Sequence, residues 1–201
     1  GNTMKYLFIT TSANFGNMIS MAFASLFLPF IPLLAKQILL NNFLSDIPAL
    51  GIAGDNVDRE WEVTPHRWDI RMIRNFMISF GLVSTVFDLI TFGTLFYLAD
   101  KIPDMFRTGW FVESLLTELL IILVIRTYKP FYKSRPCYFV LIAIIVIMGV
   151  ALALPFLPFS SLFGFVPLPL EVMASLIGIS ALYAIVSELM KRWFFRRYGC
   201  K

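Results

Sequence analysis

Residues 138–156 read YFVLIAIIVIMGVALALPF, a stretch that contains no charged side chain. An α-helix rises about 1.5 Å per residue, so a stretch of this length covers a hydrocarbon core about 30 Å thick. The whole chain agrees with this reading, because 58% of its 201 residues are hydrophobic and only 15% are charged. The stretch therefore predicts a transmembrane helix, and the chain is predicted to be an integral membrane protein surrounded by a lipid bilayer.

Five further stretches of the chain are long and apolar enough to compare with this one. They lack the alternation of apolar and polar residues that is typical of strands, so helices are predicted rather than a barrel. The fold class is therefore an all-α membrane protein, a bundle of six transmembrane helices in three antiparallel hairpins. Residues 29–32, PFIP, form the tight turn of the first hairpin. The six predicted helices cover residues 4–30, 33–54, 75–99, 109–125, 138–156 and 170–190.

The distribution of lysine and arginine predicts the orientation of the bundle. If the N-terminus is cytoplasmic, only Lys36, Lys101 and Arg107 of the 17 basic residues lie in the outer loops. Cytoplasmic loops of membrane proteins carry the excess of basic residues. We therefore expect a multi-pass protein of the plasma or inner membrane with both termini in the cytoplasm. The net charge of +4 then reflects orientation and indicates no nucleic-acid partner.

Residues 41–48 read NNFLSDIP and interrupt the second predicted helix with polar side chains and a proline. A carboxylate at membrane depth costs roughly 3 kcal/mol, so we expect Asp46 to face a partner, a cavity or an ion. Pro48 has no N–H to donate to the carbonyl oxygen of Leu44, and its ring crowds that oxygen. The second helix is therefore predicted to be broken near Pro48, where freed carbonyl groups beside Asp46 could bind a cation.

The first two predicted helices each gather polar residues on one face. A spacing of i, i+4 and i+7 in the first helix and of i, i+3 and i+4 in the second produces these two faces. If the hairpin turns them toward each other, oxygen donors that suit a hard cation meet near the middle of the membrane. Amides and hydroxyl groups also serve as hydrogen bonds between helices, which is an equally good reading for the two amides of the first helix. The two sets are Thr10, Asn14 and Asn17, and Asn42, Ser45 and Asp46.

Three acidic residues lie in the third and fourth predicted helices. Glu113 and Glu118 are about 140° apart on their helix at 100° per residue, so both cannot point to one site. Glu118 is deeper and is the better candidate ligand, whereas Glu113 is expected near the outer mouth or beside Arg107. Asp88 belongs to a stripe of small and polar residues, which predicts first a close helix contact and second an ion ligand.

Several phrases of the sequence resemble P-type ATPases. The pair NFGN at residues 14–17 and NFLSDIP at residues 42–48 is similar to the paired cation-site helices of that family. The phrases ITTSANFGNM, LLNNFLSDIPALGIAGDNVD, HRWDIR and GWFVESLLTELL most closely resemble the magnesium-transporting branch. The resemblance covers essentially all 201 residues, which correspond to the last six membrane helices of such a pump.

The resemblance implies a set of cation ligands. Asn17 departs from the calcium-pump pattern, where a glutamate is expected, and Glu118 stands where magnesium pumps often have glutamine. Magnesium keeps several waters and needs only one or two carboxylates, so the transported cation is expected to be Mg²⁺, with potassium and manganese as alternatives. The implied metal ligands are Asn14, Asn17, Asn42, Ser45 and Asp46, with Glu118 near a position that contributes a ligand in some members.

The chain divides into four predicted parts. Residues 1–54 form the ion-site hairpin and residues 55–74 a cytoplasmic loop. Residues 75–126 form a second hairpin that holds Asp88 and Glu118. Residues 127–201 form a supporting hairpin and a basic cytoplasmic tail.

The phosphorylation motif DKTGT and the dephosphorylation motif TGE of P-type pumps do not occur in the sequence. A glycine-rich phosphate loop is missing as well. ATP is thus expected to act only through other domains, and the partners of this segment are the remaining N-terminal helices and cytoplasmic domains of a pump. The segment alone is expected to be inactive. A first residue that is glycine, not methionine, favours a piece of a longer protein.

Two other readings remain open. The chain could be a freestanding carrier or channel of six helices, although its halves show no internal repeat. It could also be a purely structural membrane module, in which the polar residues serve packing.

Overall fold

The computed structural model describes residues 1–56, 70–98 and 102–198, and all its regular elements within these ranges are helical. This confirms the predicted all-α class. Short 3-10 turns and the four-residue helix α7 (Ser160–Phe163) connect the long helices. The long helices are α1 (Asn2–Phe27), α2 (Ala35–Gly51), α4 (Ile70–Leu98), α5 (Pro103–Ile125), α6 (Tyr138–Ala153) and α8 (Leu170–Tyr198).

Four stretches of the described chain are long and apolar enough to cross a membrane. They are α4, α5, residues 138–156 with α6, and α8. The helices α1 and α2 are not among these stretches: α1 carries polar residues of the predicted site, and α2 has only 17 residues. For both, the membrane crossing stays a prediction. The same holds for the arrangement of six spans in three hairpins.

The helix α2 corrects the predicted break near Pro48. It runs from Ala35 to Gly51 as one helix with Pro48 inside it. The missing N–H of Pro48 removes one hydrogen bond, but only the last turn of α2 follows it, and Pro48 is buried against neighbouring helices. Membrane helices tolerate proline where such neighbours support the backbone. The oxygen donors of the predicted site therefore come from side chains and not from an opened backbone.

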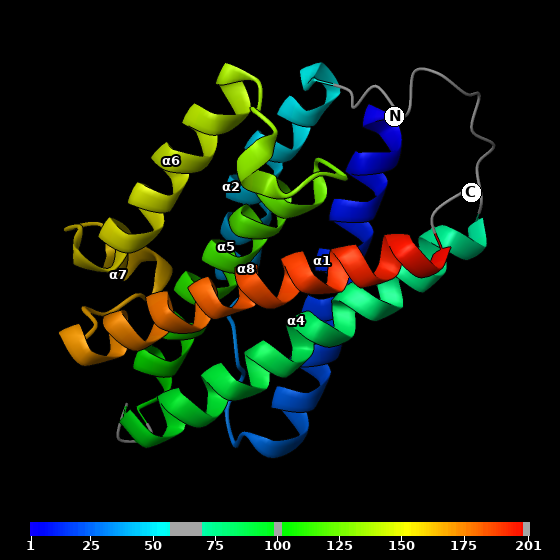
Figure 1. Cartoon of the computed structure of the whole chain (residues 1–201). Coiled ribbons are helices and arrows are strands. Elements are labelled where there is room, and N and C mark those ends of the chain that lie inside the picture. The colour runs from blue at the N-terminus through cyan, green and yellow to red at the C-terminus, as the bar shows by residue number, and fades with distance from the viewer. Residues whose placement is uncertain (57–69, 99–101, 199–201) are drawn as a thin grey trace.

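The helix α5 forms the centre of the bundle (Figure 1). It contacts α1, α2, α4, α6 and α8, and nearly all of its residues are buried. It begins at Pro103, six residues earlier than predicted, because proline is favoured in the first turn of a helix and Asp104 complements the helix dipole. The buried position of α5 brings Glu118 into contact with both helices of the predicted ion-site hairpin.

The contact between α1 and α4 is the most extensive in the described chain. Two glycines let the helices approach closely: a Cβ on Gly16 would lie 2.9 Å from the Cβ of Ser84, and one on Gly81 would lie 2.5 Å from a ring carbon of Phe15. The ring of Phe8 stacks on that of Phe76 beside this contact, at 4.4 Å between centroids. The predicted small-residue stripe of the third helix therefore lies in a close helix contact.

We expect Gly16→Val to weaken this contact, because the new side chain meets the backbone-proximal Cβ of Ser84. Overpacking of this kind costs roughly 1–3 kcal/mol. Gly149→Val in α6 is the matched control, since a Cβ on Gly149 has no neighbour within 4 Å. Thermal unfolding in detergent should show a lower midpoint for Gly16→Val than for Gly149→Val. Equal midpoints would mean that α1 and α4 can move apart to accommodate the valine without loss of stability.

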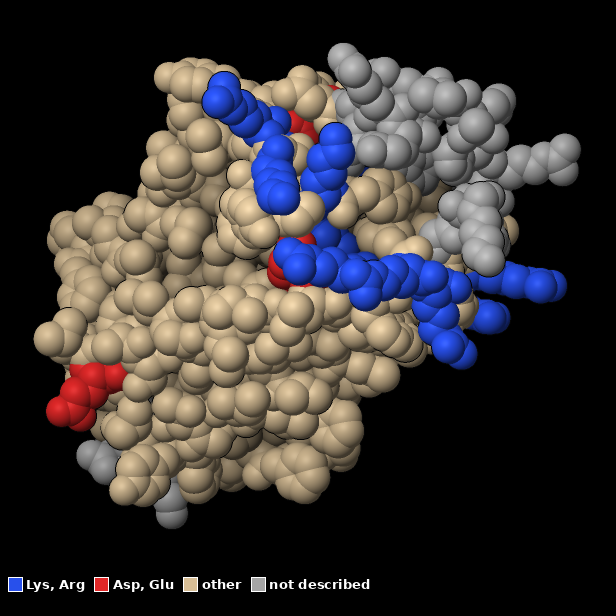
Figure 2. All heavy atoms as spheres, in the orientation of Figure 1, with Lys and Arg blue, Asp and Glu red and all other residues tan. Residues whose placement is uncertain are grey.

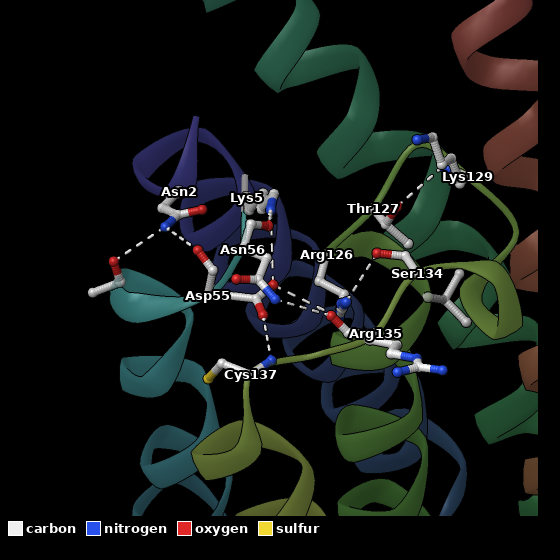
Figure 3. A network of polar contacts seen from close by, with 12 residues as sticks. Asn2, Lys5, Asp55, Asn56, Arg126, Thr127, Lys129, Ser134, Arg135 and Cys137 are labelled. Atoms are coloured by element: carbon white, nitrogen blue, oxygen red, sulfur yellow. Dashed lines mark hydrogen bonds and ion pairs between the residues drawn. The ribbon is translucent and has the colours of Figure 1, made fainter. Parts of the chain in front are cut away.

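A buried polar network ties helix ends together at one end of the bundle (Figure 3). The carboxylate of Asp55, which follows α2, lies 3.7 Å from Lys5 Nζ and 3.6 Å from Arg126 Nε. Its Oδ1 accepts a hydrogen bond from the backbone N–H of Cys137, just before α6, at 2.9 Å. Lys5 also donates to the carbonyl oxygen of Asn56 at 2.8 Å. The network therefore joins the start of α1, the segment after α2, the end of α5 and the start of α6.

Lysine and arginine side chains gather at this same end, around the ends of α5 and α8 in the face shown (Figure 2). This agrees with the charge pattern from which a cytoplasmic side was predicted, while the orientation itself stays a prediction. Most of the predicted loop 55–74 and the last three residues of the basic tail lie outside the described residues.

Candidate cation site

A cavity of about 140 Å³ lies between α1, α2 and α5. Its apolar wall comes from residues such as Ile9, Ala49 and Ile122. Its polar wall contains five of the six predicted ligands together with Thr10. These five are Asn14, Asn42, Ser45, Asp46 and Glu118. Residues far apart in the sequence are thus placed around one small space.

The sixth predicted ligand, Asn17, contacts the cavity through Glu118. Its Nδ2 donates a hydrogen bond to Glu118 Oε1 at 2.5 Å. Asn17 also lines a larger cavity of about 610 Å³, together with Asn14 and Asn42. Since α1 carries Asn14 and Asn17 and α5 carries Glu118, this hydrogen bond fixes the two helices relative to each other at the cavity.

Asn41 is a residue of the site that the sequence reading missed. It is buried, and its Nδ2 donates to Glu118 Oε1 at 3.0 Å, so one carboxylate oxygen accepts from both α1 and α2. Its Oδ1 is buried and has no hydrogen-bond partner among the described residues. The spacing of i and i+4 between Asn41 and Ser45 was available as a signal. The sequence alone does not show which of Asn41 and Asn42 faces Glu118. The two are 100° apart around the helix, and the rotation of α2 about its axis is not known from the sequence.

The two carboxylates of the cavity have different surroundings. Glu118 is buried and held by two amides, whereas Asp46 is exposed on the described chain and belongs to none of its ion pairs. Asn14 and Asn42 are exposed as well. The side of the cavity at Glu118 is therefore buried and hydrogen-bonded, and the side at Asn14, Asn42 and Asp46 is exposed.

The donor set of the cavity consists of two carboxylates, two amides and hydroxyl groups. The described residues contain no group of three or more His, Cys, Asp or Glu side chains that could hold a metal ion. Soft or strongly coordinating metals prefer thiolate and imidazole ligands, whereas oxygen donors with few carboxylates suit Mg²⁺. Side-chain oxygens at this cavity can bind a small hard cation that keeps part of its water.

Asp88 and Glu113, the other acidic residues singled out in the sequence, do not line the cavity. The predicted pairing of Glu113 with Arg107 is wrong for the described residues, because Arg107 Nη1 pairs with Asp104 Oδ1 at 2.9 Å and Glu113 is buried. The alternative position of Glu113 near the outer mouth stays a prediction. Asp88 is hydrogen-bonded to neighbouring helices, as its first reading predicted.

Comparison with known proteins identifies the family of this chain. Residues 30–193 match the family model described as "Cation transporting ATPase, C-terminus". The chain is 38% identical over 204 residues to "Magnesium-transporting ATPase, P-type 1" of Salmonella typhimurium strain LT2, covering 99% of this chain and 22% of that protein. It is 38% identical over 203 residues to the protein of the same name from Escherichia coli K12, covering 98% of this chain and 23% of the relative.

The chain thus spans less than a quarter of the length of these relatives, and it aligns along nearly its whole length. The family model covers most of the described helices, from the turn before α2 to the last turns of α8. The chain belongs to the cation-transporting P-type ATPases, whose C-terminal membrane region it represents.

Proposed function

We propose that this chain forms the cation-transport segment of a P-type pump and that its cargo is Mg²⁺. The cavity between α1, α2 and α5 carries this proposal, since it gathers Asn14, Asn42, Ser45, Asp46 and Glu118. The names of the relatives specify magnesium transport, and the donor set suits that ion. Six helices cross the cell membrane in three hairpins, with both termini in the cytoplasm.

In this proposal Asp46 is the carboxylate that touches the ion directly. The amide oxygens of Asn14 and Asn42 and the hydroxyl of Ser45 supplement it, and water completes the coordination that Mg²⁺ requires. Glu118 contributes charge from the buried wall, and its hydrogen bonds with Asn17 and Asn41 position α1 and α2 around the ion. A tilt of α1 then moves Asn14 and Asn17 together and opens the cavity to one side.

The exposed side of the cavity indicates that a partner covers it in the proposed pump. Asn14, Asn42 and Asp46 are exposed on the described chain, and polar groups of this kind are costly in contact with lipid. In the proposed pump, the N-terminal membrane helices cover this side, and phosphorylation by ATP takes place in cytoplasmic domains. The 201 residues contain neither DKTGT nor TGE, so this segment is not expected to hydrolyse ATP by itself.

Transport by the intact protein in sealed vesicles tests this function. With ATP present, the protein should move Mg²⁺ across the membrane and should form a phosphoenzyme whose amount depends on Mg²⁺ at the transport site. Transport without any nucleotide would instead support a freestanding carrier. Absence of any cation movement together with a stable fold would support a structural module.

Glu118→Gln should change the ion affinity without stopping turnover. Glutamine keeps the Oε1 acceptor for Asn17 and Asn41 and removes the negative charge. A change of roughly tenfold in apparent Mg²⁺ affinity is expected, which corresponds to about 1.4 kcal/mol. Titration of transport with Mg²⁺ measures it. Glu171→Gln at the exposed start of α8 is the control, and ion dependence identical to the wild type would mean that Glu118 only supports the fold.

A further inference from the structure

A second pair of carboxyl groups lies inside the bundle, away from the cation cavity. Asp88 of α4 is 2% exposed and Glu113 of α5 is 1% exposed. The two carboxyl groups lie within hydrogen-bonding reach of each other. Neither lines any of the three cavities of about 140, 610 and 820 Å³. The pair is therefore not part of the proposed magnesium site.

The hydrogen bonds of the pair are unequal. Asp88 Oδ2 accepts from the hydroxyl of Ser20 on α1 at 2.5 Å, and Asp88 Oδ1 accepts from the indole N–H of Trp110 on α5 at 2.9 Å. An indole N–H can only donate, so Asp88 Oδ1 is an acceptor, and Oδ2 accepts the hydrogen bond of the Ser20 hydroxyl. This is the environment of an ionised carboxylate.

Glu113 has the opposite environment. Both of its carboxyl oxygens are buried and accept no hydrogen bond from a described donor. The hydroxyl of Thr91, which is fully buried, is the other polar group beside it. A buried ionised carboxylate without donors costs several kcal/mol, whereas a protonated one can donate to a neighbouring acceptor. Asp88 supplies that acceptor.

The ion pairs between described residues place no lysine or arginine against these two carboxyl groups. The titratable groups that face the pair are Tyr183 of α8 and, further along α5, Glu118, while α1 contributes Ser20. Two adjacent carboxylates without a cation repel each other, so both cannot be ionised in this place.

We propose that Asp88 and Glu113 form a proton-binding site that holds one proton at neutral pH, carried by the carboxyl of Glu113 and donated to the carboxylate of Asp88. A proton needs no cavity and no water, in contrast to Mg²⁺, which keeps several waters at its site. Asp88 then accepts three hydrogen bonds, from Ser20, Trp110 and Glu113. The inference does not depend on the proposed transport function.

The proton site is linked to the cation cavity by two helices. Ser20, which donates to Asp88, lies one turn after Asn17, which donates to Glu118. Glu113 and Glu118 both belong to α5, five residues apart and on different faces of that helix. A movement of α1 that breaks the hydrogen bond between Asn17 and Glu118 therefore also moves the donor of Asp88. Occupancy of the two sites is coupled through this helix.

Infrared difference spectroscopy on the intact protein in magnesium-free buffer tests the proposal. The wild type minus Glu113→Gln spectrum should show the carbonyl stretch of one protonated carboxyl group at neutral pH, shifted in heavy water. Glutamine keeps the shape of Glu113 and donates to Asp88, so the variant should fold. The matched control Glu171→Gln, at the exposed start of α8, should leave that band in place.

A second measurement concerns the linkage between folding and protons. The folded site holds a proton that the unfolded chain releases at neutral pH, so the unfolding equilibrium constant should rise as the pH increases. Glu113→Gln should remove one proton from this dependence, which is a factor of about ten per pH unit. If Glu113→Gln does not fold, Asp88→Asn replaces it, and its weaker acceptor should shift the Glu113 band to higher frequency.

Three outcomes would overturn the proposal. The first is a difference spectrum without a protonated carboxyl band, which would mean that both groups are ionised. The second is loss of the band on addition of Mg²⁺ to Asp46→Asn, whose cation cavity lacks its directly bound carboxylate, because Mg²⁺ would then bind at the pair itself. The third is an unchanged pH dependence of unfolding in Glu113→Gln together with an Asp88→Asn spectrum identical to that of the wild type.

Discussion

Asp46→Asn is expected to abolish Mg²⁺ transport by the intact protein while its fold in the membrane stays unchanged. Asparagine has nearly the same shape, and Asp46 belongs to no ion pair in the described part of the chain, so the fold loses little. The ion loses its one directly bound carboxylate, which we expect to weaken binding by roughly 3 kcal/mol, about a hundredfold or more.

Two assays measure this effect: transport into sealed vesicles and ion-dependent phosphorylation by ATP. Asp104→Asn is the control, because Asp104 is also an exposed carboxylate but lies at the start of α5 beside Arg107, away from the cavity. It should transport normally. Adding Asn42→Ala to Asp46→Asn should cost little more, since both residues act in one site. Normal transport by Asp46→Asn would remove Asp46 from the site.

The sequence predicted the helices well because their signal is local. Apolar length alone predicts the starts of α6 and α8, at Tyr138 and Leu170. The end of α8 was missed, since Arg196 and Arg197 continue the helix beyond the apolar part. Basic residues favour the last turn of a helix, where they complement its dipole. Apolar patterns predict the membrane-embedded part of a helix and not its full length.

The sequence predicted which residues line the candidate site better than it predicted the backbone geometry around them. The spacing of polar residues on α1 and α2 selected the residues that line the cavity, but the break at Pro48 does not occur. A single missing hydrogen bond near the end of a helix is offset by packing that the sequence does not display. Asn41 was missed for a related reason, because only the rotation of α2 against α5 turns it toward Glu118.

Contacts between distant charges were the least predictable part. Lys5, Asp55 and Arg126 are each ordinary residues near helix ends, and their separation along the chain gives no reason to join them. Their contact depends on where α1, α2 and α5 end relative to one another, and it appears only in the folded bundle.

The buried charge network at these helix ends leads to the second large prediction. Asp55→Ala should destabilise the protein by roughly 3–5 kcal/mol, because the change removes a buried carboxylate that lies within 4 Å of both Lys5 and Arg126. The side chains of Asp55, Lys5 and Arg126 are 0%, 5% and 2% exposed, so water cannot replace the lost carboxylate. The backbone N–H of Cys137 loses its acceptor as well.

Thermal unfolding in detergent should show this loss as a fall of roughly 10 °C in the midpoint. Asp104→Ala provides the control, since its pair with Arg107 is at the surface, where an ion pair contributes less than about 1 kcal/mol. Combining Asp55→Ala with Lys5→Met should recover part of the stability, because the buried cation of the Lys5–Asp55 pair is removed together with the carboxylate. If Asp55→Ala unfolds at the same temperature as Asp104→Ala, the network does not hold α1, α5 and α6 together, and the helix ends are fixed by apolar packing alone.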